Sequence, residues 1–187
     1  MNEQHIASKA TFSVKFKTLA ASIAIAAAVA LPQLLHLLGG SIGIGSALGE
    51  SLLPMHFPIL LLGLLVGPHA AIAAGVISPL VSFLLTGMPK AAILPFMIIE
   101  LGVYGLCAGL LSNRRLPTAS KVVIAQVSGR AVRACAILIS YYGIGNRAIS
   151  PAIILSSIKA GWMGIALQII LIPVILRALD RLSERHE

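Results

Sequence analysis

The chain has 187 residues, enough for one domain; 58% of them are apolar and only 11% are charged, with a mean hydropathy of +0.97. So few charges exclude an ordinary water-soluble surface and predict an integral membrane protein. The net charge of +8 does not indicate a nucleic-acid-binding face, because the basic residues gather at the termini and in one short loop rather than among aromatic residues.

Six apolar runs follow one another along the sequence. A helix needs roughly 20 residues to cross the hydrocarbon core, and somewhat fewer where the bilayer is thin. The runs cover residues 16–38, 53–66, 70–85, 91–111, 122–142 and 152–176. Turns at 67–69 and 87–90 separate the second, third and fourth runs, since both combine glycine with proline. The predicted fold class is therefore all-α, a polytopic membrane protein with six transmembrane helices.

Residues 39–50 form a glycine-rich connection between the first two runs. It resembles a phosphate-binding loop only in composition, because it lacks the Gly-Lys-Ser/Thr ending. The short second and third runs contain Pro54, Pro58 and Pro79, which leaves a re-entrant pair as an alternative to two spans. The Ala-Val-Ala sequence at 28–30 mimics a signal-peptide cleavage site, but the first run continues far enough to span the membrane.

Basic residues are unevenly divided between the two sides of this predicted bundle. Six spans place nine of them on one side: Lys9, Lys15, Lys17, Arg114, Arg115, Lys121, Arg177, Arg181 and Arg185. Only Lys90 and Arg147 fall on the other side. Because Lys and Arg concentrate in cytoplasmic loops, both termini are expected to be cytoplasmic. One integral domain is predicted, with a cytoplasmic segment at 1–15, a bundle at 16–178 and a cytoplasmic tail at 179–187, in a plasma membrane of prokaryotic type.

Four charged residues lie inside the apolar runs: Glu100, Arg130, Arg133 and Lys159. A charge at the bilayer centre costs about 2.5–3.5 kcal/mol on insertion scales, so these side chains are expected to face the protein interior and to mark a functional site. At 1.5 Å per residue, all four fall near the middle or in the outer half of the membrane. Arg130 and Arg133 share a helix face, and Glu100 shares one with Tyr104.

The expected site therefore combines one carboxylate with up to three cations. Pairing of Glu100 with Arg130 or Lys159 is the structural alternative, but one acid cannot neutralise three bases. The surplus positive charge indicates an anionic or strongly hydrogen-bonding ligand from outside, because arginine can bind a carboxylate through two parallel hydrogen bonds. Three weaker candidates for the site are His56, Trp162 and Asn146, the last of which lies in the last outer loop. His56 could instead be an interfacial residue, and Trp162 could instead belong to an aromatic belt.

Small residues recur at every fourth position of the first run, at Ala20, Ala24 and Ala28. Such a stripe lets a second helix approach closely, either within the chain or from a partner. Enzyme signatures are missing, since the sequence contains neither an HExxH zinc pair nor a GxSxG serine elbow. The chain is therefore expected not to be an enzyme and to use no cofactor and no metal.

Five stretches resemble the substrate-binding S components of energy-coupling factor (ECF) transporters: residues 53–68, 78–89, 100–105, 129–130 and 161–173. The similarity covers about residues 15–178. It implies capture of a vitamin or related micronutrient from outside, at a site built mainly by the fourth to sixth helices and covered by the first loop. It also implies docking, through the alanine stripe at residues 20–28, on a transmembrane coupling subunit that carries two ATP-binding subunits. ATP hydrolysis on those partners would then topple the S component and release the substrate inside.

The substrate and the energy source stay open at this stage. The cationic surplus favours a carboxylate-bearing or polar micronutrient such as pantothenate, with pyrimidine, pyridoxine-like and corrinoid-related molecules as alternatives. The alternative function is a stand-alone proton-coupled secondary transporter of a small metabolite that uses Glu100 as its proton site. An integral membrane enzyme is disfavoured by the missing motifs. Dependence of uptake on ATP separates the first two functions.

Overall fold

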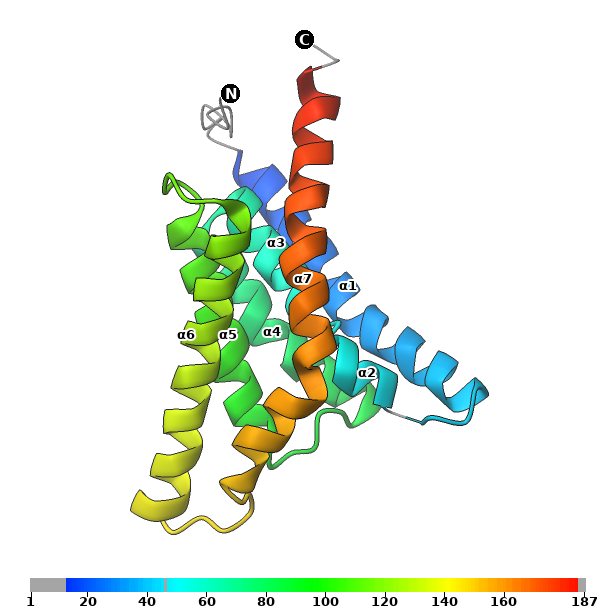
Figure 1. The fold of residues 1–187 in the computed structure, drawn as a ribbon, viewed down its shortest axis with the longest axis vertical. Coiled ribbons are helices and arrows are strands. Elements are labelled where there is room, and N and C mark those ends of the chain that lie inside the picture. Colours follow the sequence, from blue (N-terminus) through cyan, green and yellow to red (C-terminus); the bar gives the residue numbers. More distant parts are fainter. Residues whose placement is uncertain (1–12, 46, 185–187) are drawn as a thin grey trace.

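The computed structural model describes residues 13–45 and 47–184, and within these ranges the chain is helical and contains no strand (Figure 1). The elements are α1 (Val14–Ser41), α2 (Ala47–Leu52), α3 (His56–Val66), α4 (Pro68–Thr86), α5 (Leu94–Leu111), α6 (Thr118–Leu138), the π-helical turn η1 (Ile139–Gly143) and α7 (Ala152–Glu184). With α2 joined to α3, and α6 to η1, six of the described helices are long and apolar enough to cross a membrane. The all-α prediction with six spans is confirmed.

Two details differ from the sequence prediction. Much of the expected connection at 39–50 is helical, because α1 continues to Ser41 and α2 begins at Ala47. The expected tail at 179–187 is helical as far as Glu184, since α7 continues past the apolar run through strong helix formers. The second and third spans, with 20 and 19 residues, are each long enough to cross the membrane separately, which favours two spans over a re-entrant pair.

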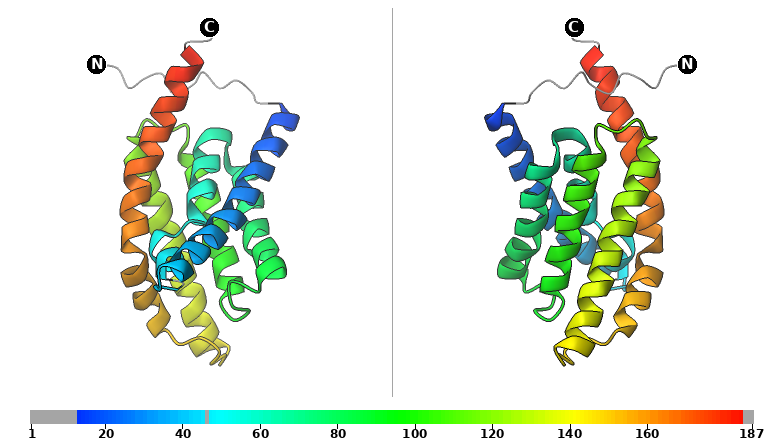
Figure 2. Two further views of the ribbon diagram at one scale, coloured as in Figure 1. Left: turned by 90° about the vertical axis from the view of Figure 1, so that its right-hand side faces the viewer. Right: turned by 90° about the vertical axis from the view of Figure 1, so that its left-hand side faces the viewer.

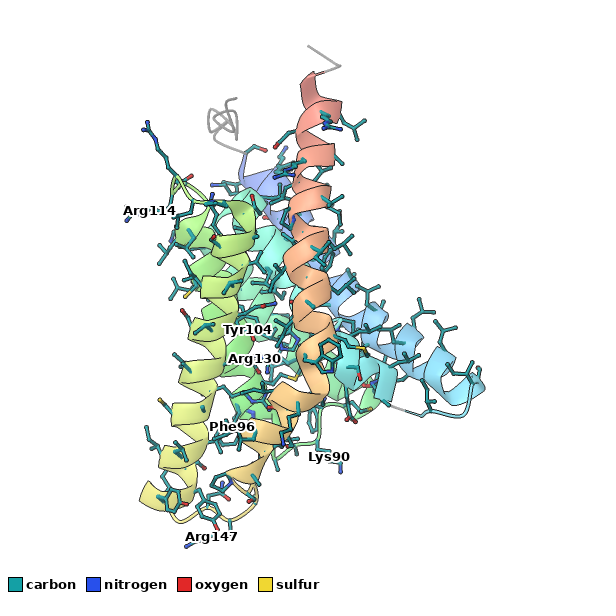
Figure 3. All side chains as sticks on the ribbon, viewed as in Figure 1. Lys90, Phe96, Tyr104, Arg114, Arg130 and Arg147 are labelled. Carbon is teal, nitrogen blue, oxygen red and sulfur yellow. The ribbon has the colours of Figure 1, made fainter. Side chains whose placement is uncertain are left out.

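The connections alternate between the two ends of the bundle as an even number of spans requires. The start of α1, the α5–α6 connection with Arg114 and the end of α7 lie at one end, whereas Lys90 and Arg147 lie at the other (Figures 1 and 3). The uneven charge distribution is thus present in three dimensions. That the first end is cytoplasmic stays a prediction from the positive-inside rule. Lys9 and Arg185, which contributed to that prediction, lie outside the described residues.

The centre of the bundle is formed by α3, α4 and α5, with α1 crossing α3 and α4 on one side and α6 and α7 on the other (Figure 2). Glycine lets α4 and α5 touch backbone to backbone. A Cβ atom on Gly75 would lie 2.5 Å from the carbonyl oxygen of Leu101, and one on Gly105 would overlap the backbone of Ala71. Close approach through small residues is the usual way in which membrane helices associate, because lipid supplies no hydrophobic drive between them.

The second span is interrupted between α2 and α3, and its first part, α2, lies beside α7. Leu53 adopts a positive φ of 50° directly before Pro54, which prevents the helix from continuing. The short helix α2 then packs against α7, where a Cβ atom on Gly164 would lie 2.5 Å from the carbonyl oxygen of Leu52. This break places the first turn of α3, with His56, in the interior of the bundle.

Candidate functional site

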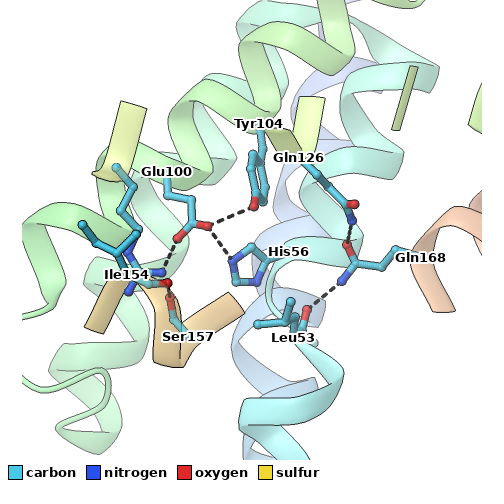
Figure 4. A network of polar contacts seen from close by, with 9 residues as sticks. Leu53, His56, Glu100, Tyr104, Gln126, Ile154, Ser157 and Gln168 are labelled. Atoms are coloured by element: carbon cyan, nitrogen blue, oxygen red, sulfur yellow. Dashed lines mark hydrogen bonds and ion pairs between the residues drawn. The ribbon is translucent and has the colours of Figure 1, made fainter. Parts of the chain in front are cut away.

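Glu100 is the centre of a buried polar cluster on α3, α5 and α6, and its side chain is 1% exposed (Figure 4). Its Oε1 accepts a hydrogen bond from the Tyr104 hydroxyl at 2.9 Å, and its Oε2 accepts one from Nη1 of Arg133 at 2.8 Å. His56 Nε2 lies 3.8 Å from Oε1, and the imidazole and Tyr104 rings have centroids 5.3 Å apart. Both oxygens of the carboxylate are therefore engaged within the chain.

Local sequence explains how these side chains meet. Glu100 and Tyr104 lie one turn apart on α5, so they share a face of that helix. On α6, Gly129 leaves room for Tyr104, because a Cβ atom at that position would overlap the tyrosine ring. Arg133 lies one turn further along α6 and reaches Glu100 across the α5–α6 contact.

A second group of polar contacts connects α6, α7 and the break between α2 and α3 (Figure 4). Gln126 on α6 donates a hydrogen bond from Nε2 to Oε1 of Gln168 on α7 at 2.8 Å. Gln168 in turn donates from Nε2 to the carbonyl oxygen of Leu53 at 3.1 Å, at the break between α2 and α3. Sequence reasoning did not select Gln168, although a glutamine within the last apolar run is the kind of polar residue that marks helix contacts in membranes.

A small cleft lies between α6 and α7, partly open to its surroundings, and its volume of about 10 Å³ leaves room for about one water molecule in the described arrangement. Its polar lining is Arg130, Arg133 and Ser157, and its apolar lining is Ala134, Ile137, Ile154 and Ile158. Arg130 is half-buried, and its Nε is buried without a hydrogen-bond partner among the described residues. Ser157 was not selected from the sequence either; its position beside the expected lysine was the available signal.

Three predicted site residues lie elsewhere. Lys159 and Trp162 are exposed on α7, and the exposed Asn146 accepts a hydrogen bond from the Ala148 backbone N–H within its own loop. The expectation that all four membrane charges face the interior is thus met for Glu100 and both arginines and is wrong for Lys159. The reason is that α7 lies at the edge of the bundle and contacts α2, α3 and α6 along only part of its circumference. His56, by contrast, lies in the buried cluster rather than at an interface.

The alanine stripe of α1 faces the interior of this chain. Ala24 and Ala28 are buried in the apolar core, and Ala20 packs against it. The other face of α1 exposes small residues with the same spacing, at Ser22, Ala26 and Ala30.

Within residues 13–45 and 47–184, the His, Cys, Asp and Glu side chains form no group of three that could hold a metal ion.

The family described as ECF transporter, substrate-specific component, matches residues 17–176, which is most of the chain. No curated protein and no solved structure gives a match. A buried cluster of charges among six spans agrees with a protein that binds a small molecule within the membrane. The chain belongs to the family of the substrate-specific components of ECF transporters, which are multi-pass plasma-membrane proteins that bind small molecules and are not an enzyme class.

Proposed function

We propose that the chain is the high-affinity binding subunit of an ECF-type importer for a vitamin or related micronutrient. It captures the substrate from outside and docks on a coupling subunit, while two partner subunits hydrolyse ATP. The observation that carries the proposal is the group of polar residues Glu100, Arg130 and Arg133 in a chain of this family. Arg130 and the neighbouring Tyr104 lie about midway along the bundle (Figure 3). Charges at that depth are costly to hold in a membrane and are usually retained for function.

The chemistry of the cluster supports a carboxylate-bearing substrate, of which pantothenate is one example. Arg130 and Arg133 both line the cleft, and the buried Nε of each has no hydrogen-bond partner among the described residues, although Nη1 of Arg133 is paired with Glu100. A carboxylate accepts hydrogen bonds from guanidinium in a well-matched geometry. Tyr104 and His56 belong to the proposed site through their contacts with Glu100.

Docking on the coupling subunit through Ala20, Ala24 and Ala28 is part of the proposal and requires a movement. In the described arrangement Ala24 and Ala28 are covered by the core of this chain. Docking through them therefore includes displacement of α1 from α3 and α4. We expect Ala24→Leu to prevent co-purification with the coupling module while the folded subunit still binds substrate. Loss of assembly in Ala26→Leu, with Ala24→Leu unaffected, would assign docking to the exposed face of α1 instead.

The alternative function, a stand-alone proton-coupled transporter, makes Glu100 the proton site. Protonation of Glu100 would remove the negative charge that pairs with Arg133 and would leave that guanidinium without its counter-ion. That geometry favours a supporting role for Glu100 and does not favour the alternative.

Two measurements test the proposal. Mass spectrometry of small molecules that co-purify with the detergent-solubilised protein is expected to reveal one micronutrient bound in near-equal amount to protein. Uptake of that compound by vesicles should require the coupling module and ATP. Uptake by the chain alone, with acidification of the vesicle lumen and without ATP, would instead establish the proton-coupled carrier.

A further inference from the structure

We infer that the cleft between α6 and α7, once widened, holds a ligand with a single negative charge that is bound by Arg130 and Ser157, while Nη1 of Arg133 stays paired with Glu100. The inference rests on the proposed function and deepens it, because it names the residues that bind the ligand and the charge class of the ligand.

The first step is the charge balance on α5 and α6. Glu100 and Arg133 form a direct ion pair of 2.8 Å, with side-chain exposures of 1% and 14%. The second carboxylate oxygen accepts a hydrogen bond from Tyr104. Breaking this pair would leave an uncompensated charge in a poorly polarisable environment. Arg130 and Arg133 together carry one positive charge more than the single carboxylate of Glu100 can neutralise, and the buried Nε of each arginine has no hydrogen-bond partner among the described residues.

The second step is the cation that remains. Arg130 lies at the cleft, and its buried Nε has no hydrogen-bond partner within the described ranges of the chain. One negative charge on a ligand would neutralise this one guanidinium. A doubly charged phosphate ester would leave a surplus negative charge beside Glu100, and a cationic ligand would repel both arginines. A neutral ligand would leave Arg130 unmatched, which is unfavourable at this depth.

The third step is the wall of the cleft opposite Arg130. Ser157 on α7 donates its hydroxyl to the carbonyl oxygen of Ile154 at 3.0 Å, and the hydroxyl can rotate to donate to an anion instead. The remaining wall is aliphatic, from Ile137, Ile154 and Ile158. The ligand therefore joins its single charge to a small apolar body, as a monocarboxylic acid does.

Ile137 connects the cleft to an apolar cluster. Ile137 belongs to a small apolar cluster with Phe96 and with Ile149 from the connection between η1 and α7. Phe96 lies between Arg130 and the end of the bundle that carries Arg147 (Figure 3). The side chains of the cluster are apolar and offer no hydrogen-bond donor to a second anionic group.

Binding of matched probe pairs to the purified subunit tests the inference. Each pair consists of a monocarboxylic acid and its neutral counterpart: pantothenate and panthenol, nicotinate and nicotinamide, biotin and biotinamide. The compound that co-purifies with the protein is added to the panel, together with pyridoxal phosphate as a phosphate ester. We expect one acid to bind at least roughly tenfold more tightly than its neutral counterpart, as the loss of a charge-assisted bond implies.

Variants distinguish direct contact between Arg130 and the ligand from a general effect of positive charge. Arg130→Gln should weaken acid binding by roughly 10- to 150-fold and remove the preference over the neutral counterpart. Arg130→Lys should retain part of that preference, because it keeps the charge and loses the planar fork. Ser157→Ala should weaken acid binding several-fold, whereas Ser156→Ala is the matched control because the neighbouring serine is exposed outside the cleft. Melting temperatures confirm that each variant is folded.

The outcomes distinguish this inference from the proposed function. A neutral counterpart that binds as tightly as its acid, a bound phosphate ester, or an acid preference that survives in Arg130→Gln overturns the inference. In each of these cases a bound micronutrient leaves the proposed function in place. If no compound co-purifies and no probe binds, both the inference and the proposed function fail.

Discussion

Two helix contacts in this molecule are built in opposite ways. Along α4 and α5, Gly75 and Gly105 bring the backbones into direct contact and leave no space between the helices. Between α6 and α7, a bridge of Gln126 and Gln168 is followed by a cleft lined by Arg130, Arg133 and Ser157. The α4–α5 contact forms because glycine has no side chain to separate the backbones. The α6–α7 contact forms through polar side chains.

The difference indicates how a small membrane protein divides its tasks. The α4–α5 contact is rigid, because two backbones in van der Waals contact have no side chains that can rearrange. It provides a fixed frame for Glu100 and Tyr104 on α5. The α6–α7 contact is held by a few side-chain bonds and contains a small polar cleft. The expected consequences of disturbing each contact therefore differ in kind as well as in size.

The largest effect on stability is expected at Arg133, whose ion pair with Glu100 connects α6 to α5. Arg133→Met should destabilise the fold by about 3–5 kcal/mol, because it leaves the Glu100 carboxylate buried without its cation. The free energy of unfolding, measured by SDS titration in mixed micelles, checks this. The double variant Glu100→Gln with Arg133→Met should recover much of the loss, and Arg130→Met should lose far less. Equal stability of Arg133→Met and the unmodified chain would contradict the internal role of the pair.

The next effect is expected within the rigid contact. Gly105→Ala should cost about 1–3 kcal/mol, because its new methyl group can be accommodated only if α4 and α5 separate. Gly102→Ala is the matched control on the same helix, since its Cβ would meet only Val76 Cγ2, at 3.6 Å. The control should be neutral or slightly stabilising, given that alanine favours helix over glycine. Unfolding measurements that fail to separate the two variants would count against backbone contact between α4 and α5.

A smaller effect is expected at the bridge between α6 and α7. Polar side-chain bonds between membrane helices contribute about 0.6 kcal/mol on average and about 1.7 kcal/mol at most. A double-mutant cycle with Gln126→Leu and Gln168→Leu should give a coupling energy in that range. Because Gln168 also holds the Leu53 carbonyl, its single variant should be the more damaging of the two. Additive effects of the two changes would show that the bridge does not hold α6 to α7.

The smallest effect is expected at Lys159. Lys159→Gln removes a positive charge from the exposed part of α7, outside the cleft. Stability should change by no more than about 0.5 kcal/mol, as for most exposed positions. Ligand affinity, measured by calorimetry, should stay the same. A loss of affinity as large as that of Arg130→Gln would show that Lys159 reaches the ligand, as the sequence analysis expected.

The sequence predicted the parts of the site that depend on spacing along one helix. Glu100 with Tyr104, and Arg130 with Arg133, share faces of α5 and α6 as their intervals indicate. It named Arg130 or Lys159 as the internal partner of Glu100, and this was wrong. The partner is Arg133, because the rotation of α6 against α5 decides which arginine reaches the carboxylate. Lys159 was predicted to face the interior and is exposed. The spacing of residues along α7 does not show which side of that helix packs against the other helices.

By itself, the amino-acid sequence determined six spans, two ends of unequal charge and a polar site at mid-depth, because hydropathy and helix period act locally along the chain. Only the tertiary structure decided that Glu100 pairs with Arg133, that Arg130 and Ser157 share a cleft, and that Ala24 and Ala28 are covered by the chain's own core. Those outcomes depend on how far each helix is rotated and how closely two backbones approach, and both are fixed by contacts between residues distant in sequence.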